Sequence, residues 1–179
     1  MNSERIFKRY GSYGVDVRFQ GANLRISELY SGASSARRTR TVAIVEFIGG
    51  AEIPALDAQI RAGRSIGATL TAAGWRVRKT TRWLGALPAH PNTSRVRHTL
   101  CTPLPAPVAA HQYLLSATQA GRSVDYALIT EIHDGDYLTL ADISPALAAS
   151  VTDETPIRSA LDQLGDVEFF GETRQQPCA

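Results

Sequence analysis

The sequence predicts an α+β fold, with a mostly antiparallel sheet and helices packed on one face of that sheet. Runs of alternating apolar and polar residues occur in pairs joined by short turns, which is typical of hairpins. Segments that begin with proline or serine and end with glycine lie between these pairs, as amphipathic helices do. Hairpins outnumber strand–helix–strand units, and this ratio favours antiparallel pairing.

The first half of the chain predicts a hairpin, a central strand and two helices. Residues 15–19 and 24–26 alternate in polarity around a turn. Residues 41–48 form a nearly continuous apolar run, which predicts a central strand covered on both faces. A helical region at 54–73 follows, in which Ser65 caps the second helix.

The second half predicts further strands followed by helices. The strand-like runs are residues 75–83, 94–101, 113–118, 124–132 and a short last run at 167–170, and the helical runs lie within 139–165. The first of these helices starts at Thr139, with Asp142 as its capping-box partner, or near Ser144. The second carries Arg158 and Asp162 at i, i+4, a spacing that predicts an ion pair.

Length and composition indicate one domain that spans residues 1–179. The chain has 179 residues, of which 44% are hydrophobic and 20% charged, and such a chain buries a core without a metal or a disulfide. We expect about ten residues at the N-terminus and about eight at the C-terminus to be frayed. The N-terminus lacks the apolar stretch of a secretory signal, and no stretch is apolar enough for a membrane span. Cys101 and Cys178 show neither metal-site spacing nor a disulfide framework, so we expect a cytoplasmic protein without a membrane partner.

Charge is distributed unevenly along the chain. Residues 1–100 hold 16 Arg and Lys against 6 Asp and Glu, a net charge of +10, whereas residues 101–179 hold 3 Arg against 11 Asp and Glu, a net charge of −8. The halves either neutralise each other within the fold, meet across the interface of a homo-oligomer, or present an anion-binding surface. The overall charge of +2 and the lack of a binding motif argue against nucleic acid as a partner.

Glu131 and His133 are the candidate catalytic residues. They are two positions apart on a predicted strand, so they share one face of it. Together with Asp134 and Asp136 they suit general acid/base chemistry or a metal. Asp and His are equally ordinary turn residues, so a turn without a site is the alternative. We predict no cofactor and no metal.

Arg76, Arg78 and Arg82 are the candidate substrate-binding residues. Their guanidinium groups project from one face of the predicted strand at 75–83 if that strand is regular. Such a face would bind carboxylates or phosphates through bidentate hydrogen bonds, so the expected partner is a small anionic ligand. The alternative is a solvated face whose arginines pair with the acidic second half.

Residues 63–67 match the G-x-S-x-G motif of a hydrolase nucleophile elbow, with Ser65 at its centre. The elbow requires a strand directly before the serine, and residues 55–62 predict a helix instead. We interpret Ser65 as a helix cap.

Residues 52–70 resemble a stretch of the chorismate lyase family and of related ligand-binding domains of transcription regulators. The similarity lies in Glu52-Ile-Pro-Ala-Leu-Asp57 and in Ser65-Ile-Gly-Ala-Thr-Leu70. The resemblance implies a helix-flanked antiparallel sheet with an enclosed pocket. It also implies elimination of pyruvate from chorismate by a buried arginine and glutamate, without a cofactor. No pocket residue of that family is transferred by motif.

Three functional hypotheses follow. The first is a domain that binds a small anionic ligand, such as an aromatic carboxylate, and acts as a cofactor-free carbon–oxygen lyase. The second is a non-catalytic interaction or oligomerising module that uses the basic and acidic halves. The third is a serine hydrolase that uses Ser65.

Overall fold

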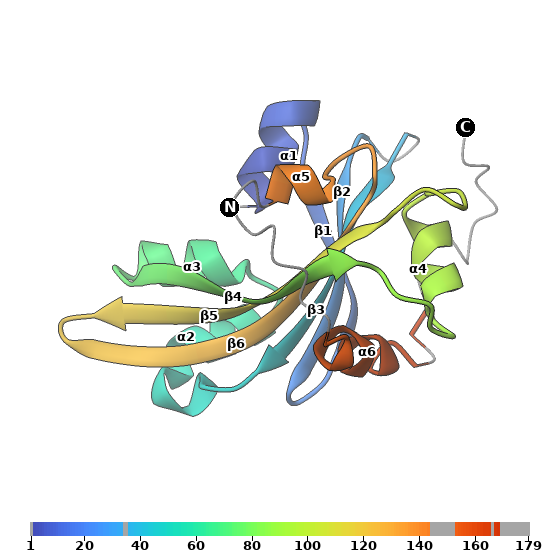
Figure 1. Ribbon diagram of the computed structural model, residues 1–179. Helices are drawn as coiled ribbons and strands as arrows, with labels where there is room; N and C mark the ends of the chain where they lie inside the picture. Colours follow the sequence, from blue (N-terminus) through green and yellow to red (C-terminus); the bar gives the residue numbers. More distant parts are fainter. Residues whose placement is uncertain (1, 34–35, 144–152, 166, 169–179) are drawn as a thin grey trace.

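In the part of the chain that the structure describes, six strands form one antiparallel sheet (Figure 1). The computed structural model describes residues 2–33, 36–143, 153–165 and 167–168. The strands are β1 (Gly14–Gln20), β2 (Leu24–Ser31), β3 (Arg38–Phe47), β4 (Arg76–Ala86), β5 (Ala109–Gln119) and β6 (Arg122–His133). Their order across the sheet is β1-β2-β3-β6-β5-β4, so two meanders meet where β3 pairs with β6. The predicted α+β fold with an antiparallel sheet is confirmed.

Helices flank the strands and precede the first of them. They are α1 (Asn2–Tyr10), the 3₁₀ helix η1 (Gly50–Glu52), α2 (Pro54–Arg61), α3 (Ile66–Ala72), α4 (Thr93–Thr99), α5 (Leu140–Ile143) and α6 (Thr155–Asp162). α1 occupies the N-terminal residues that we expected to be frayed. That expectation is wrong because Ile6 is fully buried and packs in one cluster with Leu29 and Ala43 of the sheet.

Helices cover both faces of the sheet rather than one. Successive side chains of β3 point to opposite faces. Val42 and Ile44 pack in a cluster with residues of α4 and α6. Val45 and Phe47 pack on the other side, in a cluster with residues of α2 and α3. α1 and α5 lie beside each other on this second side, which we call the α3 face (Figure 1). β3 is therefore the central strand, buried on both sides, that its apolar run predicted.

α4 replaces the strand predicted for residues 94–101, and that prediction is wrong. Val96 and Leu100 are both fully buried, and their spacing of four residues places them on one side of a helix. The alternation of polar and apolar residues in this segment is too short to distinguish a period of two from a period of 3.6.

The polar contacts predicted for α5 and α6 are confirmed only in part. One half of the predicted capping box is confirmed, because the backbone nitrogen of Thr139 donates to Asp142 Oδ2 at 2.8 Å. The hydroxyl of Thr139 donates to the same oxygen at 2.7 Å, and the backbone nitrogen of Asp142 donates to the carbonyl oxygen of Thr139. The predicted pair of Arg158 with Asp162 is wrong. Arg158 instead binds Glu154, one turn earlier, at 2.7 Å.

Some predictions concern the last residues and the cysteines. No strand is formed at 167–168, and the other residues of the strand predicted at 167–170 lie outside the described residues. Ser144 and the C-terminal residues expected to be frayed also lie outside them.

Cys101 is disulfide-bonded, whereas we predicted no disulfide. The other cysteine of the chain, Cys178, lies outside the described residues. None of the described helices has both the length and the apolar character needed to cross a membrane.

Candidate functional site

A cleft opens on the α3 face of the sheet, between α1 and α3. Its outer groove has a volume of about 1210 Å³ and is lined by residues of α1, α3, α5 and strands β4 to β6. Its inner pocket has a volume of about 130 Å³ and extends over the sheet as far as β1 and the loop between α2 and α3. Lys79, Tyr113 and Glu131 line both parts, so they mark the junction. We refer to the groove and the pocket together as the cleft.

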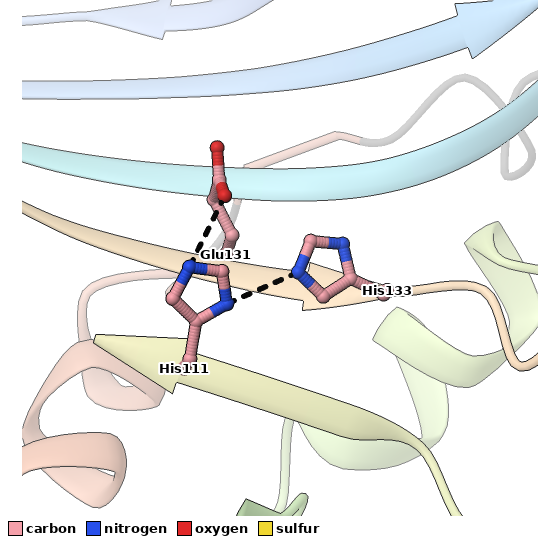
Figure 2. Close-up of side chains that lie close together, drawn as sticks. All are labelled: His111, Glu131 and His133. Atoms are coloured by element: carbon pink, nitrogen blue, oxygen red, sulfur yellow. Dashed lines mark hydrogen bonds and ion pairs between the residues drawn. The ribbon is translucent and has the colours of Figure 1, made fainter. Parts of the chain in front are cut away.

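Three polar side chains come together at this junction because of strand register. His111 of β5 lies directly opposite Glu131 of β6, and His133 is two residues further along β6, so all three point to the same face (Figure 2). His111 Nε2 is 3.4 Å from Glu131 Oε2. His111 Nδ1 is 3.2 Å from His133 Nε2. The predicted neighbours Glu131 and His133 are thus linked through His111, which is twenty positions away from Glu131 in the sequence.

The surrounding residues hold these side chains in place. Tyr113 donates its hydroxyl to Glu131 Oε1 at 3.2 Å. The Oγ1 of Thr41 lies 3.0 Å from His133 Nδ1, on the side away from the cleft junction. Asn2 of α1 donates its amide to the same Thr41 oxygen at 3.2 Å. Each end of the cluster is therefore anchored by a second polar contact.

Burial and nearby charges set the protonation of the cluster. Burial alone raises the pKa of Glu131, but nearby positive charge, above all the ammonium of Lys79, outweighs it, and the pKa ends below its ordinary value. Burial lowers the pKa of His133 to about 3, against the attraction of Glu131. Burial also lowers the pKa of His111. At neutral pH an ionised carboxylate therefore faces two neutral imidazoles.

The ionised carboxylate also determines the direction of the hydrogen bonds. The carboxylate of Glu131 only accepts hydrogen bonds, and His111 Nε2 lies 3.4 Å from it, so the proton of neutral His111 is favoured on Nε2. His111 Nδ1 then accepts from His133 Nε2, and His133 Nδ1 accepts from the hydroxyl of Thr41. That hydroxyl accepts in turn from Asn2. All donors in this chain point toward the carboxylate, so the chain stabilises the ionised form of Glu131.

Asp134 and Asp136, which the sequence grouped with Glu131 and His133, belong to a turn outside the cleft cluster. Asp134 is buried and accepts from Arg38 at 3.0 Å and from Arg40 at 2.7 Å. Asp136 binds the same Arg38 at 2.8 Å. These pairs join the basic and the acidic halves of the chain within the fold, as one of the charge hypotheses predicted. The four predicted residues thus divide into two in the cleft and two in a structural turn.

The three predicted anion-binding arginines do not gather in the cleft. Arg76 lines the edge of the outer groove. Arg78 lies opposite Ser116 and points to the other face of the sheet, between Val77 and Lys79, which line the cleft. Arg82 sits at a bulge in β4 that breaks the regular alternation. The basic residue of β4 that lies at the junction of groove and pocket is Lys79, whose Nζ is 4.1 Å from the centre of the Tyr113 ring.

Two further residues of β2 line the inner pocket. Arg25 is 5% exposed and donates to Gln20 Oε1 at 2.7 Å and to the backbone oxygens of Ile60 and Arg64, so it ties the loop between α2 and α3 to the sheet. Burial lowers its pKa. Ser27 is 3% exposed, and its Oγ has no hydrogen-bond partner among the described residues. Its hydroxyl is therefore free for a ligand of the pocket.

Ser65 does not have the geometry of a nucleophile elbow. The residues before it form α2 and a loop that turns at Gly63, where φ is +100°. Ser65 itself is exposed and occupies the N-cap position of α3, as we interpreted it, although its side chain makes no capping hydrogen bond.

No family model matches the chain, and no curated protein matches it. The resemblance of residues 52–70 to chorismate lyases therefore stays a prediction. Those residues form the end of η1, α2 and most of α3.

Proposed function

We propose that the cleft binds a small anionic ligand with a single ring. The observation that carries this proposal is the position of Lys79, where an apolar pocket meets a groove with cationic walls. The cationic residues that line the cleft are Arg5, Lys8, Arg25, Arg64, Arg76 and Lys79, and the acidic ones are Glu4 and Glu131. This excess of positive charge favours an anion.

The inner pocket supports a ring-shaped ligand of limited size. Its apolar lining consists of Val15, Leu29, Ala43, Val45, Ile66, Val77, Leu115 and Ile129, with Tyr13 and Tyr113 beside them. Its volume of about 130 Å³ is close to the roughly 150 Å³ of an apolar cavity that admits benzene. A ring in this pocket would place a carboxylate near Lys79, and the Ser27 hydroxyl would serve a polar substituent.

A thermal-shift and calorimetric titration with benzoate tests this proposal. We expect benzoate to raise the unfolding temperature, and benzamide and benzylamine, which lack the negative charge, to raise it far less. Lys79→Met should lose the benzoate effect. Arg78→Met is the matched control, because it removes a cation from the next residue on the opposite face. Equal shifts with the three compounds, or equal loss in both variants, would contradict the proposal.

The lyase activity is the finer part of the proposal. The chorismate lyase resemblance implies a buried arginine and a buried glutamate, and Arg25 and Glu131 are 5% and 6% exposed and line the same pocket. Chorismate is an anionic single-ring compound, and elimination needs a proton acceptor, the role we predict for Glu131 or His133. Enzymatic detection of pyruvate released from chorismate checks this activity. Absence of pyruvate would refute the lyase and leave the ligand proposal standing.

A non-catalytic assembly module is the second candidate. It is favoured by the exposed guanidinium groups of Arg76, Arg78 and Arg82 on the edge strand β4, for which no ion pair is found among the described residues. Assembly through opposite charges would weaken with salt, since exposed charges are screened over about 8–10 Å at physiological ionic strength. A sedimentation coefficient that is the same at low and high salt would refute it.

Two further predictions can be checked directly. A serine hydrolase would label with a fluorophosphonate at Ser65, and the exposed, unsupported position of that residue leads us to expect no labelling. The cytoplasmic location stays a prediction, and the alternative is an oxidising compartment, in which the disulfide of Cys101 would persist. Fractionation of the expressing cells would decide between the compartments.

A further inference from the structure

We propose that His111, Glu131 and His133 form a binding site for one divalent transition-metal ion at the junction of the cleft. One ligand atom from each of the three residues can be chosen so that all lie within 4.8 Å of one another. Figure 2 shows the two imidazoles and the carboxylate converging from the adjacent strands β5 and β6. This inference goes beyond the ligand proposal and does not rest on it.

The donor set fits a particular class of metal ion. Two imidazole nitrogens and one carboxylate oxygen suit Zn²⁺, Fe²⁺ and similar ions, whereas Mg²⁺ and Ca²⁺ prefer oxygen ligands only. Metal sites that act on substrates commonly have three protein ligands and leave further positions open. Here the open positions face the outer groove, which all three residues line.

The donor atoms lie within 4.8 Å of one another, so binding one ion needs only a small contraction of the cluster. Two atoms bound at about 2.1 Å to one ion lie about 3.0–3.4 Å apart in octahedral or tetrahedral geometry. The contacts of His111 with Glu131 and with His133 are 3.4 and 3.2 Å. His111 presents a different nitrogen to each neighbour, so on binding an ion it gives up one of these contacts and turns its ring.

The ligands lie on interior strands, and polar neighbours contact their remaining nitrogen and oxygen atoms. β6 lies between β3 and β5, so Glu131 and His133 sit on an interior strand. Metal-binding histidines usually have their second nitrogen fixed by a hydrogen bond, and the Oγ1 of Thr41 lies 3.0 Å from His133 Nδ1. Tyr113 binds the second oxygen of Glu131 in the same way. One carboxylate balances one of the two charges of the ion, and an anion in the groove would balance the other.

Titration of the untagged full chain with Co²⁺ and Zn²⁺, after treatment with a chelator, tests the site. We expect one equivalent of Co²⁺ to bind with visible d–d absorption bands, Zn²⁺ to displace it, and Mg²⁺ to leave it in place. His111→Ala should weaken Co²⁺ binding by about 100-fold or more, and Thr41→Val by about 10-fold. His98→Ala, which removes an exposed imidazole away from the cleft, should bind as the wild type does.

Glu131→Gln provides a second ligand variant of unchanged size, in case a smaller side chain prevents folding. No stoichiometric Co²⁺ binding by the wild type, or unchanged binding by both ligand variants, would overturn the inference. Benzoate binding measured in the presence of chelator reads the ligand proposal separately. The two can therefore fail independently of each other.

Discussion

The stability of the fold should fall steeply as the pH is lowered, because His133 is buried in its neutral form. Its pKa is about 3 in the folded protein and about 6.5 in the unfolded chain. Below pH 6.5 the unfolded state therefore binds a proton that the folded state does not, and this favours unfolding. Between pH 7 and pH 4.5 the single imidazole costs about 2.5 kcal/mol of folding free energy.

Urea unfolding at the two pH values, with a chelator present throughout, measures this loss. His133→Gln removes the titrating group, so its stability should fall by about 2.5 kcal/mol less than that of the wild type over the same interval. His98 is exposed, so His98→Gln should behave as the wild type does. If the wild type and His133→Gln lose the same free energy, the imidazole is not held neutral and the described hydrogen-bond chain is wrong.

Three other variants test the packing around the cleft. Ser27→Ala removes a buried hydroxyl that has no hydrogen-bond partner among the described residues, so urea unfolding should show unchanged stability or a gain of up to about 1 kcal/mol. Calorimetry should show weaker benzoate binding by this variant. A clear loss of stability would mean that the hydroxyl is satisfied. Arg25→Met removes the hydrogen bonds to the backbone oxygens of Ile60 and Arg64, so the free energy of unfolding should fall by about 2–3 kcal/mol. Hydrogen exchange of the backbone amides at 62–65 should become faster. Protection of these amides equal to that in the wild type would contradict the tie between loop and sheet. Asp134→Asn leaves two arginines next to a neutral side chain, so the free energy of unfolding in the same assay should fall by about 3 kcal/mol. A fall of less than about 1 kcal/mol would place the turn outside the stable core.

The sequence was informative where the pattern of side chains is local. The alternation at 15–19 and the apolar run at 41–48 predicted strands that β1 and β3 confirm. The contact of Asp142 with the backbone nitrogen of Thr139 followed from the spacing of these residues and is also confirmed. In each case a few neighbouring residues carry the physical preference, so no knowledge of the tertiary fold was needed.

The rest depended on contacts between distant residues. His111 and Glu131 are twenty positions apart, and only the register of β5 with β6 brings them together. Lys79 was overlooked because its neighbours Arg76 and Arg78 dominate the charge of the strand, and the sequence does not say which face of β4 meets the cleft. The chain has only two lysines, and this rarity is the one local signal that could have drawn attention to Lys79.

Backbone NMR during a titration with benzoate tests the central claim, that the cleft on the α3 face is the ligand site. The amide signals of Lys79, Tyr113 and Glu131 should shift together and saturate with one equivalent bound. The amide signals of Val96 in α4 and Ile157 in α6, on the opposite side of the sheet, should stay in place. Saturable shifts confined to Val96 and Ile157, or no saturable shifts at all, would contradict the assignment of this cleft as the functional site.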